Sequence, residues 1–470
     1  MKNLCTLIKR NPNVVGYAIL AVLLFCSCFL VEFSFIVGLY VIFFAVFVRN
    51  EGKILGLILF IYPFYLILSI VNVGIYSSNS IELNKGIYLM DSLLNVLKFF
   101  IFLLYINRVI KKEKKINLKI FIPLVLFLFY MLLPFHNIDW HDWLSVVLTY
   151  FSLYVFFEER DEINFVYLVR VFFIGLILSC VFGLYHELSP LLIKYMRYIP
   201  TYMYINRYPA LTFNPLHLAA FLIIAISLLF LLKYKNQITS IVFFVLFIPF
   251  LIWGYLTVSR SFILILLIIL CIFYVFYYIK YKKASFNFLW MVFIILCIVT
   301  ILLLDHTKCV FMRFSYDYFS QELSSEVTID EILSGSAEIY LNRKDIYRIY
   351  FYDFFSSLET TFFGRGISRL PIGGLNAHNI ILQKLWEHGL IGCVFYVVIF
   401  VMMINWKKIK EWKKYVPTLI FIIPFISFLM LEIIDYEYIG YALTFVMFGW
   451  INKAGDKDEK KLGKEKDIKT

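Results

Sequence analysis

The sequence predicts an all-α, polytopic membrane protein with about 12–14 membrane-spanning helices. Hydrophobic residues make up 62% of the 470 positions and charged residues only 16%, whereas soluble domains have about 45–50% and about 25%. The apolar residues form long runs, and the basic residues gather between these runs. These properties exclude a soluble globular enzyme, a disordered chain and a nucleic-acid-binding protein.

The spans are predicted from the length of the apolar runs, because a spanning helix needs about 20 apolar residues. Residues 14–48 would form one helix of about 52 Å, so a turn is expected at Glu32, the only charged residue in that run. The first run follows Lys9 and Arg10 but leads to no cleavage site, so it is expected to remain as a helix rather than a signal peptide. The fourteen candidate segments are 14–31, 33–48, 54–74, 87–107, 118–135, 142–157, 164–184, 210–232, 238–256, 261–281, 286–304, 379–405, 415–433 and 438–452.

The basic residues predict the orientation of the spans. With the N-terminus in the cytoplasm, 29 of the 44 Lys and Arg residues fall in cytoplasmic segments, five in short outer loops, seven in the segment 305–378 and three within spans. Cytoplasmic loops carry an excess of Lys and Arg. We therefore expect both termini to be cytoplasmic and residues 305–378 to form one long extracytoplasmic loop of a multi-pass protein of the cytoplasmic membrane.

The outer cations are mostly isolated arginines rather than runs of lysine. A guanidinium group binds phosphate through two parallel hydrogen bonds, so the set indicates a phosphate-bearing substrate reached from the outer face. The alternative is that they snorkel or pair with loop acids such as Glu338, Asp345 and Glu359. The set comprises Arg197, Arg207, Arg260, Arg313, Arg343, Arg348, Arg365 and Arg369.

The long outer loop contains one helical pattern and two turn-rich stretches. The pattern covers residues 342–358, and the turns are Gly364-Arg365-Gly366 and Pro371-Ile372-Gly373-Gly374. In the span that follows, Gly389 and Gly392 are expected to permit close approach of a neighbouring helix.

That span also carries a polar stripe. Asn379, Gln383 and Glu387 are spaced i, i+4 and i+8, so they share one face of the helix, with Lys384 and His388 beside them. Ionisable residues within a span usually face a cavity or a partner. The alternative is that these side chains satisfy one another at a helix–helix contact.

Neither cysteine nor histidine spacing indicates a metal site or a disulfide framework. The eight cysteines form no C-x-x-C pair. His136, Asp139, His141 and Asp142 form the one metal-like cluster outside the membrane, and a solvated loop is the preferred interpretation.

Several motifs resemble the signature of the O-antigen polymerase and O-antigen ligase superfamily, in the same order, over about residues 195–405. The family pattern is an Arg before a T-F-x-N-P turn, a T-x-S-R turn, an Arg that opens the loop helix, G-x-G, H-N, and a helix with E-x-G-x-x-G. In two places the chain departs from it: Ala210 stands where Gly is common, and His217 where a small or amide residue is frequent. The matching residues are Arg207 to Pro215, Thr257 to Ser261, Arg343, Gly364 to Gly366, Ala377 to Asn379, Gln383, Glu387, Gly389 and Gly392.

The resemblance implies a fold similar to C-type glycosyltransferases and an active site on the extracytoplasmic face. It implies that the chain polymerises undecaprenyl-pyrophosphate-linked oligosaccharide repeat units into capsular polysaccharide or O-antigen, by inverting transfer without metal or cofactor. The expected partners are this lipid-linked oligosaccharide, membrane lipid, a chain-length regulator and a flippase, and no nucleic acid.

We expect arginines to stabilise the pyrophosphate leaving group, because no metal is implied. The arginines chosen for this role are Arg207, Arg260 and Arg343. Asn379 and Gln383 complete the expected substrate-binding set, although the first role of Asn379 is to cap its helix.

His378 is the expected general base, since its ring titrates near neutral pH and could take a proton from the acceptor hydroxyl. A hydrogen bond to the pyrophosphate is its rival role. Glu387 is expected either to orient this histidine or to be the base itself.

Three other functions stay open. Within the family, the chain could be a ligase that moves polymer to lipid A core, or an enzyme that transfers glycans to protein. In a different class, it could be a lipid-linked oligosaccharide flippase. A flippase is expected to show paired halves and short loops. The sequence shows no internal repeat, and the one long outer loop of residues 305–378 breaks any symmetry between halves.

Four regions follow from these observations. Residues 1–194 form N-terminal spans, 195–405 the catalytic region with the loop 305–378, 406–452 the C-terminal spans, and 453–470 a charged cytoplasmic tail.

Overall fold

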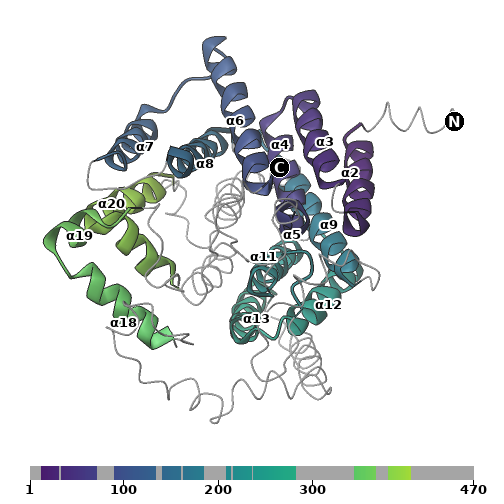
Figure 1. Ribbon diagram of the computed structural model, residues 1–470. Coiled ribbons are helices and arrows are strands. Elements are labelled where there is room, and N and C mark those ends of the chain that lie inside the picture. The colour runs from purple at the N-terminus through teal and green to yellow at the C-terminus, as the bar shows by residue number, and fades with distance from the viewer. Residues whose placement is uncertain are drawn as a thin grey trace, which may run out of the picture. The chain divides into compact units, whose positions relative to one another are not determined.

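The computed structural model describes residues 12–30, 33–70, 89–133, 140–159, 162–184, 208–212, 215–234, 237–281, 343–366 and 379–403. Within these ranges the chain is helical and contains no strand (Figure 1). Four of the described helices are long and apolar enough to cross a membrane, namely Glu51–Leu68, Leu89–Ile110, Phe165–Gly183 and Pro215–Lys233. The chain is therefore an all-α protein with the helices of a membrane protein.

Eleven of the fourteen apolar segments coincide with described helices. The segments 286–304, 415–433 and 438–452 lie outside the described residues. The helices are α2 (Pro12–Phe29), α3 (Phe33–Val48), α4 (Glu51–Ile61), α5 (Tyr65–Ile70), α6 (Leu89–Ile110), α7 (Leu118–Tyr130), α8 (Trp140–Glu159), α9 (Phe165–Gly183), α11 (Pro215–Tyr234), α12 (Ser240–Leu256), α13 (Arg260–Tyr281), α18 (Arg343–Phe354), α19 (Leu358–Phe363) and α20 (Ile380–Met403), with a 3-10 turn η1 (Tyr62–Phe64) between α4 and α5.

The helices form two compact units that interleave along the chain. The first unit comprises residues 1–115 and 151–221, and the second comprises 116–150 and 222–470. The predicted region boundaries at residues 194, 405 and 452 lie outside the described residues and stay predictions.

The first long apolar run breaks where a turn is expected. Helix α2 ends at Phe29 and α3 begins at Phe33, whose N–H donates to the Leu30 carbonyl at 3.0 Å. The two helices then pack against each other, and the Tyr40 hydroxyl donates to the Gly16 carbonyl at 3.0 Å.

Five charged residues tie together the ends of three helices in the first unit, α4, α6 and α8. Arg108, near the end of α6, lies 2.8 Å from Glu159 of α8, 2.9 Å from Glu162 and 3.6 Å from Glu51 at the start of α4. Lys114 also pairs with Glu162. Because Glu159 is only 2% exposed, its charge depends on these cations.

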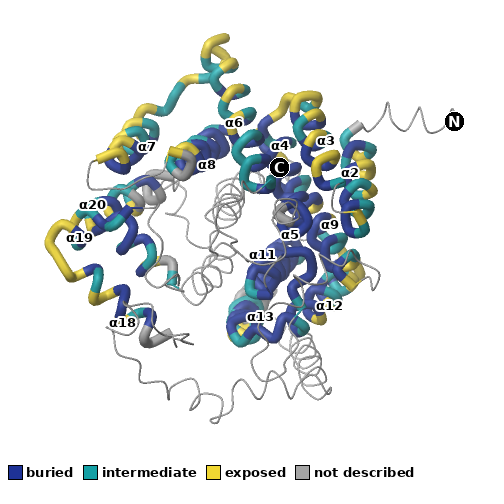
Figure 2. The backbone as a smooth tube through the Cα atoms, in the orientation of Figure 1, coloured by how far each residue is buried: buried dark blue, intermediate teal, exposed yellow. Residues whose placement is uncertain are grey.

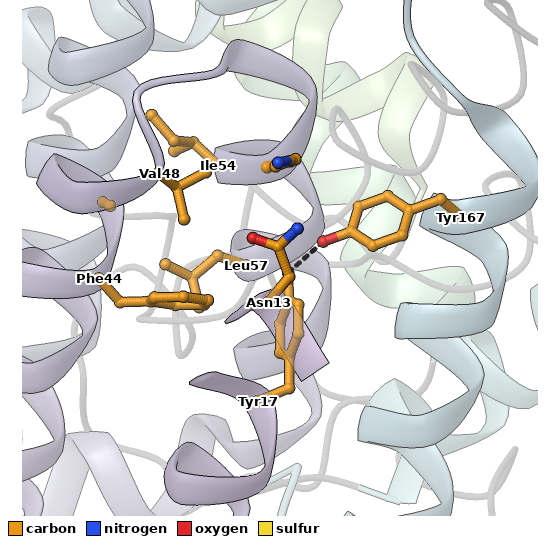
Figure 3. A pocket seen from close by; sticks show the side chains of 9 residues that line it. Asn13, Tyr17, Phe44, Val48, Ile54, Leu57 and Tyr167 are labelled. Carbon is orange, nitrogen blue, oxygen red and sulfur yellow. Dashed lines mark hydrogen bonds between the residues drawn. The ribbon is translucent and has the colours of Figure 1, made fainter. Parts of the chain in front are cut away.

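A narrow recess of about 180 Å³ lies between the starts of α2, α4 and α9 and the end of α3 (Figure 3). The Tyr167 hydroxyl donates to the Tyr17 hydroxyl across it at 3.0 Å. Most of the other lining residues are apolar, among them Phe44 and Leu57. This recess is thus part of the packing of the first unit.

In the second unit, α20 packs against α7, α18 and α19. The inner sides of these helices are buried, as the dark blue segments in Figure 2 show. This arrangement positions the candidate site.

Candidate functional site

The predicted loop helix is two helices rather than one. Helix α18 begins at Arg343 and ends at Phe354, four residues before the predicted end, and α19 follows from Leu358. The reason is local capping, because the Ser357 hydroxyl accepts from the Thr360 N–H at 3.1 Å and starts a new helix.

Helix α18 is held against α20 by apolar side chains. Ile346 and Tyr350 form a buried cluster with Leu382 and Trp386 of α20. The rings of Tyr350 and Trp386 meet edge to face, 5.3 Å apart. Arg343, the residue expected to bind pyrophosphate, therefore opens a helix that is fixed on α20.

The Gly364-Arg365-Gly366 motif docks on α20. The Arg365 N–H donates to the Trp386 carbonyl at 2.8 Å, and the Gly366 N–H donates to the Glu387 carbonyl at 2.9 Å. Gly364 and Gly366 have positive φ angles of 81° and 90°, a conformation that is unfavourable for residues with a Cβ atom. Two segments selected separately from the sequence thus form one contact.

Helix α20 is interrupted at the same place. Gly389 has φ 63° and ψ −175°, which are not helical values. A Cβ at Gly389 would lie 2.4 Å from the Phe362 carbonyl oxygen, and one at Gly364 would lie 2.5 Å from the Gly389 nitrogen. Glycine at both positions therefore permits the backbones of α19 and α20 to cross.

Tyr130 of α7 holds this crossing from the other side. Its hydroxyl lies 2.8 Å from the His388 carbonyl and 3.1 Å from the Phe363 carbonyl, so one donor serves both chain segments. A Cβ at Gly392 would lie 2.9 Å from the Tyr130 ring. The expected close helix approach at Gly392 is therefore made by α7.

Asp353 links the loop to α20 by an ion pair with Arg365 and a hydrogen bond from Trp386. Arg365 donates to both of its carboxylate oxygens, at 3.0 and 2.6 Å, and the Trp386 indole N–H donates to it at 2.7 Å. Glu338, Asp345 and Glu359 are the partners that the sequence suggests for loop arginines, yet the acid that Arg365 binds is Asp353.

The polar stripe of α20 makes hydrogen bonds within its own helix. The Gln383 amide donates to Glu387 Oε1 at 2.7 Å, and the Lys384 ammonium donates to Glu387 Oε2 at 2.6 Å. His388 Nε2 lies 3.8 Å from Glu387 Oε2. Lys384, Glu387 and His388 are all buried, so the stripe is a compact, charge-paired cluster.

Asn379 caps α20, as the sequence predicts. Its side-chain oxygen accepts from the N–H groups of Ile381 and Leu382 at 3.0 and 3.2 Å. The stripe therefore starts at the first turn of the helix.

Arg260 follows a tight turn between α12 and α13. Val258 has φ 50°, which is strained for a β-branched residue. The Ser259 hydroxyl accepts from the Phe262 N–H at 3.3 Å and caps α13, of which Arg260 is the first residue. Arg260 is half-buried at this helix start.

The turn after Arg207 docks on an interrupted helix in the first unit. Ala210 has a left-handed backbone with φ 49°, a conformation that favours glycine. The Leu66 N–H donates to the Leu211 carbonyl at 2.9 Å, beside the break that Pro63 makes between α4 and α5. At the other end of this turn, the Tyr208 hydroxyl donates to the Cys180 carbonyl at 2.6 Å.

The predicted site residues are thus only partly placed. Arg207 and His378 lie outside the described residues, as do His136 and Asp139 of the metal-like cluster. The remaining predicted residues belong to the second unit. Helix α20 carries Gln383 and Glu387 and is capped by Asn379, while Arg343 begins α18 and Arg260 begins α13.

Tyr130 and Asp353 are site residues that sequence reasoning does not find. Tyr130 lies 258 positions before its partner His388, and nothing in a single sequence signals that pairing. Asp353 could have been found as the acid on the amphipathic loop helix nearest to Gly364-Arg365-Gly366. No family model, curated protein or solved structure matches this chain.

Proposed function

We propose that this protein is a membrane glycosyltransferase that polymerises undecaprenyl-pyrophosphate-linked oligosaccharide repeat units on the outer face of the cytoplasmic membrane. It has about 12–14 spans and cytoplasmic termini in this proposal, which rests on the apolar runs and the distribution of Lys and Arg. The product is capsular polysaccharide or O-antigen.

One observation carries the proposal. The Gly364-Arg365-Gly366 turn binds α20 through two backbone hydrogen bonds, one to the carbonyl of Glu387, a separate part of the family-like signature, and one to the carbonyl of the adjacent Trp386. A signature that arose from composition alone would have no reason to converge in space. The segment that leads to His378 starts from this contact, and Asn379 ends it at the cap of α20.

The contacts of Glu387 favour a positioning role over that of the base. Both of its carboxylate oxygens already accept hydrogen bonds, one from Lys384 and one from Gln383. A general base must have an oxygen within hydrogen-bond reach of the acceptor hydroxyl, whereas these two bonds direct both oxygens toward side chains of their own helix. We therefore keep His378 as the proposed base and Arg207, Arg260 and Arg343 as the proposed pyrophosphate ligands.

The test is the chain-length ladder of surface glycan in a deletion strain, rescued with wild type or with His378→Ala. Single repeat units without a ladder in the variant would support polymerisation with His378 as an essential residue. A normal ladder would remove the base assignment. Long polymer retained on its lipid carrier would indicate a ligase, and lipid-linked units trapped on the inner leaflet would indicate a flippase.

A matched pair of arginines tests the pyrophosphate assignment. Arg343→Ala is expected to shorten or abolish the ladder, whereas Arg348→Ala, an exposed arginine five residues along the same helix, is expected to leave it intact. If both variants lose the ladder equally, the loss reflects folding of α18 rather than substrate binding by Arg343.

A further inference from the structure

The outer side of α18 and α19 is largely apolar, although these helices belong to the long outer loop and also expose the charged residues Arg348 and Glu359. Five large side chains on it are exposed, with Leu358 at 78%, Phe355 at 66% and Tyr352 at 62%. The yellow segments of α18 and α19 in Figure 2 show this side. We define this outer patch as Phe351, Tyr352, Phe355, Leu358 and Phe362. Surfaces of this kind on soluble proteins mark interaction sites.

The opposite side of α18 is already occupied. Ile346, Tyr350 and Phe354 are buried on it, the first two against α20. The last turns of α18 are therefore apolar on two sides, with the exposed Arg348 one turn earlier on the outer side. Packing within the second unit explains only the inner side.

The polar groups between the two helices are satisfied internally. The Ser356 hydroxyl donates to the Asp353 carbonyl at 2.6 Å, and the Thr361 hydroxyl lies 2.9 Å from the carbonyls of Phe354 and Ser357. The Asp353 carboxylate is neutralised by Arg365. Such internal pairing is what a segment in contact with lipid requires, because lipid supplies no hydrogen bonds.

The patch is also level with the apolar outer side of α20. The end of α19 crosses α20 at Gly389, nine residues and about 13 Å along from Ile380. Before and after this crossing, α20 exposes Ile381, Leu390 and Val394. The patch therefore lies at a depth where α20 itself presents apolar side chains outward.

We propose that the outer patch is embedded in the outer leaflet of the bilayer, with phospholipid acyl chains and their headgroup boundary as its partner. Aromatic side chains favour this boundary, and amphipathic helices bury their apolar sides in it. Residues 351–363 are then a membrane-seated hairpin within the long loop. This inference rests on α20 being a span and does not depend on glycosyl transfer.

The test places a fluorescent label in the full-length chain, reconstituted in phosphatidylethanolamine and phosphatidylglycerol vesicles. An environment-sensitive dye is attached to Leu358→Cys or to Glu359→Cys in a variant without native cysteines. Glu359 is the matched control, since it is exposed in the same helical turn but polar. The dye at position 358 is expected to emit at shorter wavelength and to be quenched by spin-labelled lipid, while the dye at 359 is quenched by aqueous iodide.

Equal quenching of both positions by iodide would overturn the proposal. So would protection of position 358 only after lipid-linked oligosaccharide is added, which would make the patch a glycan platform. If the cysteine-free chain does not fold, the native chain carries Leu358→Asp or Glu359→Gln instead. A loss of folded protein extracted from membranes is expected for the first only, and wild-type yield of Leu358→Asp would contradict the lipid contact.

Discussion

At the scale of single residues, the candidate motifs share a left-handed backbone. Ala210, Val258, Gly364 and Gly389 all have positive φ angles, and each lies in a segment that resembles the family signature. Residues held in such conformations cost free energy and gather at functional sites. This backbone conformation is therefore present even at Ala210, which is not a glycine.

Gly389→Ala should destabilise the protein by about 2 kcal/mol or more, since it adds a left-handed penalty to a contact 2.4 Å from the Phe362 oxygen. Thermal unfolding in detergent measures this change. Leu390→Ala is the control, because that neighbouring side chain is 42% exposed and should cost far less. Similar melting temperatures for the two variants would show that the crossing is not rigid.

Residues near one another in sequence could be predicted, and distant partners could not. The i, i+4 spacing correctly predicts that Gln383 and Glu387 share a face, and they are hydrogen-bonded. The cap at Asn379 also follows from residue type alone. The contacts of Tyr130 and Asp353 depend on the packing of separate helices, which local periodicity does not encode.

At the scale of elements, α6 ends in a Schellman motif built on a lysine. Lys112 has φ 60°, its N–H donates to the Val109 carbonyl, and the Glu113 N–H donates to the Arg108 carbonyl. Lys112→Gly should therefore raise stability by about 0.5–1 kcal/mol. Lys111→Gly, one residue earlier and equally solvent-exposed, should lower it, and unfolding curves in detergent compare the two. A stabilising Lys111→Gly would contradict this assignment of the cap.

The charged cluster that joins the ends of α4, α6 and α8 predicts a pH dependence. Hydrogen bonds from Lys114 and Arg108 lower the pKa of Glu162 from 4.5 to about 2. A lowered folded-state pKa gives stability that is present above pH 4.5 and is lost as the pH falls toward 2. Glu162→Gln should therefore unfold more easily than wild type at neutral pH and lose less stability on acidification.

Glu113→Gln is the control for this titration. Glu113 and Glu162 are both 53% exposed, but the Glu113 carboxylate lies 3.8 Å from the Arg108 guanidinium, whereas that of Glu162 lies 2.9 Å from it. Melting temperatures between pH 6 and 3 should fall for Glu113→Gln as they do for wild type. A flat profile in wild type itself would exclude the Glu162 contribution.

Hydropathy predicts where helices lie but not where they break. Eleven apolar runs locate twelve α-helices of the described chain, with α4 and α5 in one run, because burial of apolar side chains decides those positions. The break at Ser357 depends on its capping hydroxyl. At Pro63 the Leu66 N–H finds an acceptor in another segment, and before Gly389 two α20 carbonyls find donors in another segment. For Gly389 that donor segment is more than twenty residues away, beyond any local pattern.

At the scale of the whole molecule, the charge distribution and the contacts of the first unit both group the same three connecting segments. Three segments that the positive-inside rule assigns to the cytoplasm, at residues 49–53, 108–119 and 158–164, meet through Arg108 and its partners. If one span between them were miscounted, the alternation of cytoplasmic and outer loops would place these three segments on different sides of the membrane. We therefore predict that Lys112→Cys reacts with a membrane-impermeant maleimide in inside-out vesicles only, whereas Glu359→Cys reacts in right-side-out vesicles only. Reaction of both positions from the same side would contradict the orientation, and with it the placement of the candidate site on the outer face.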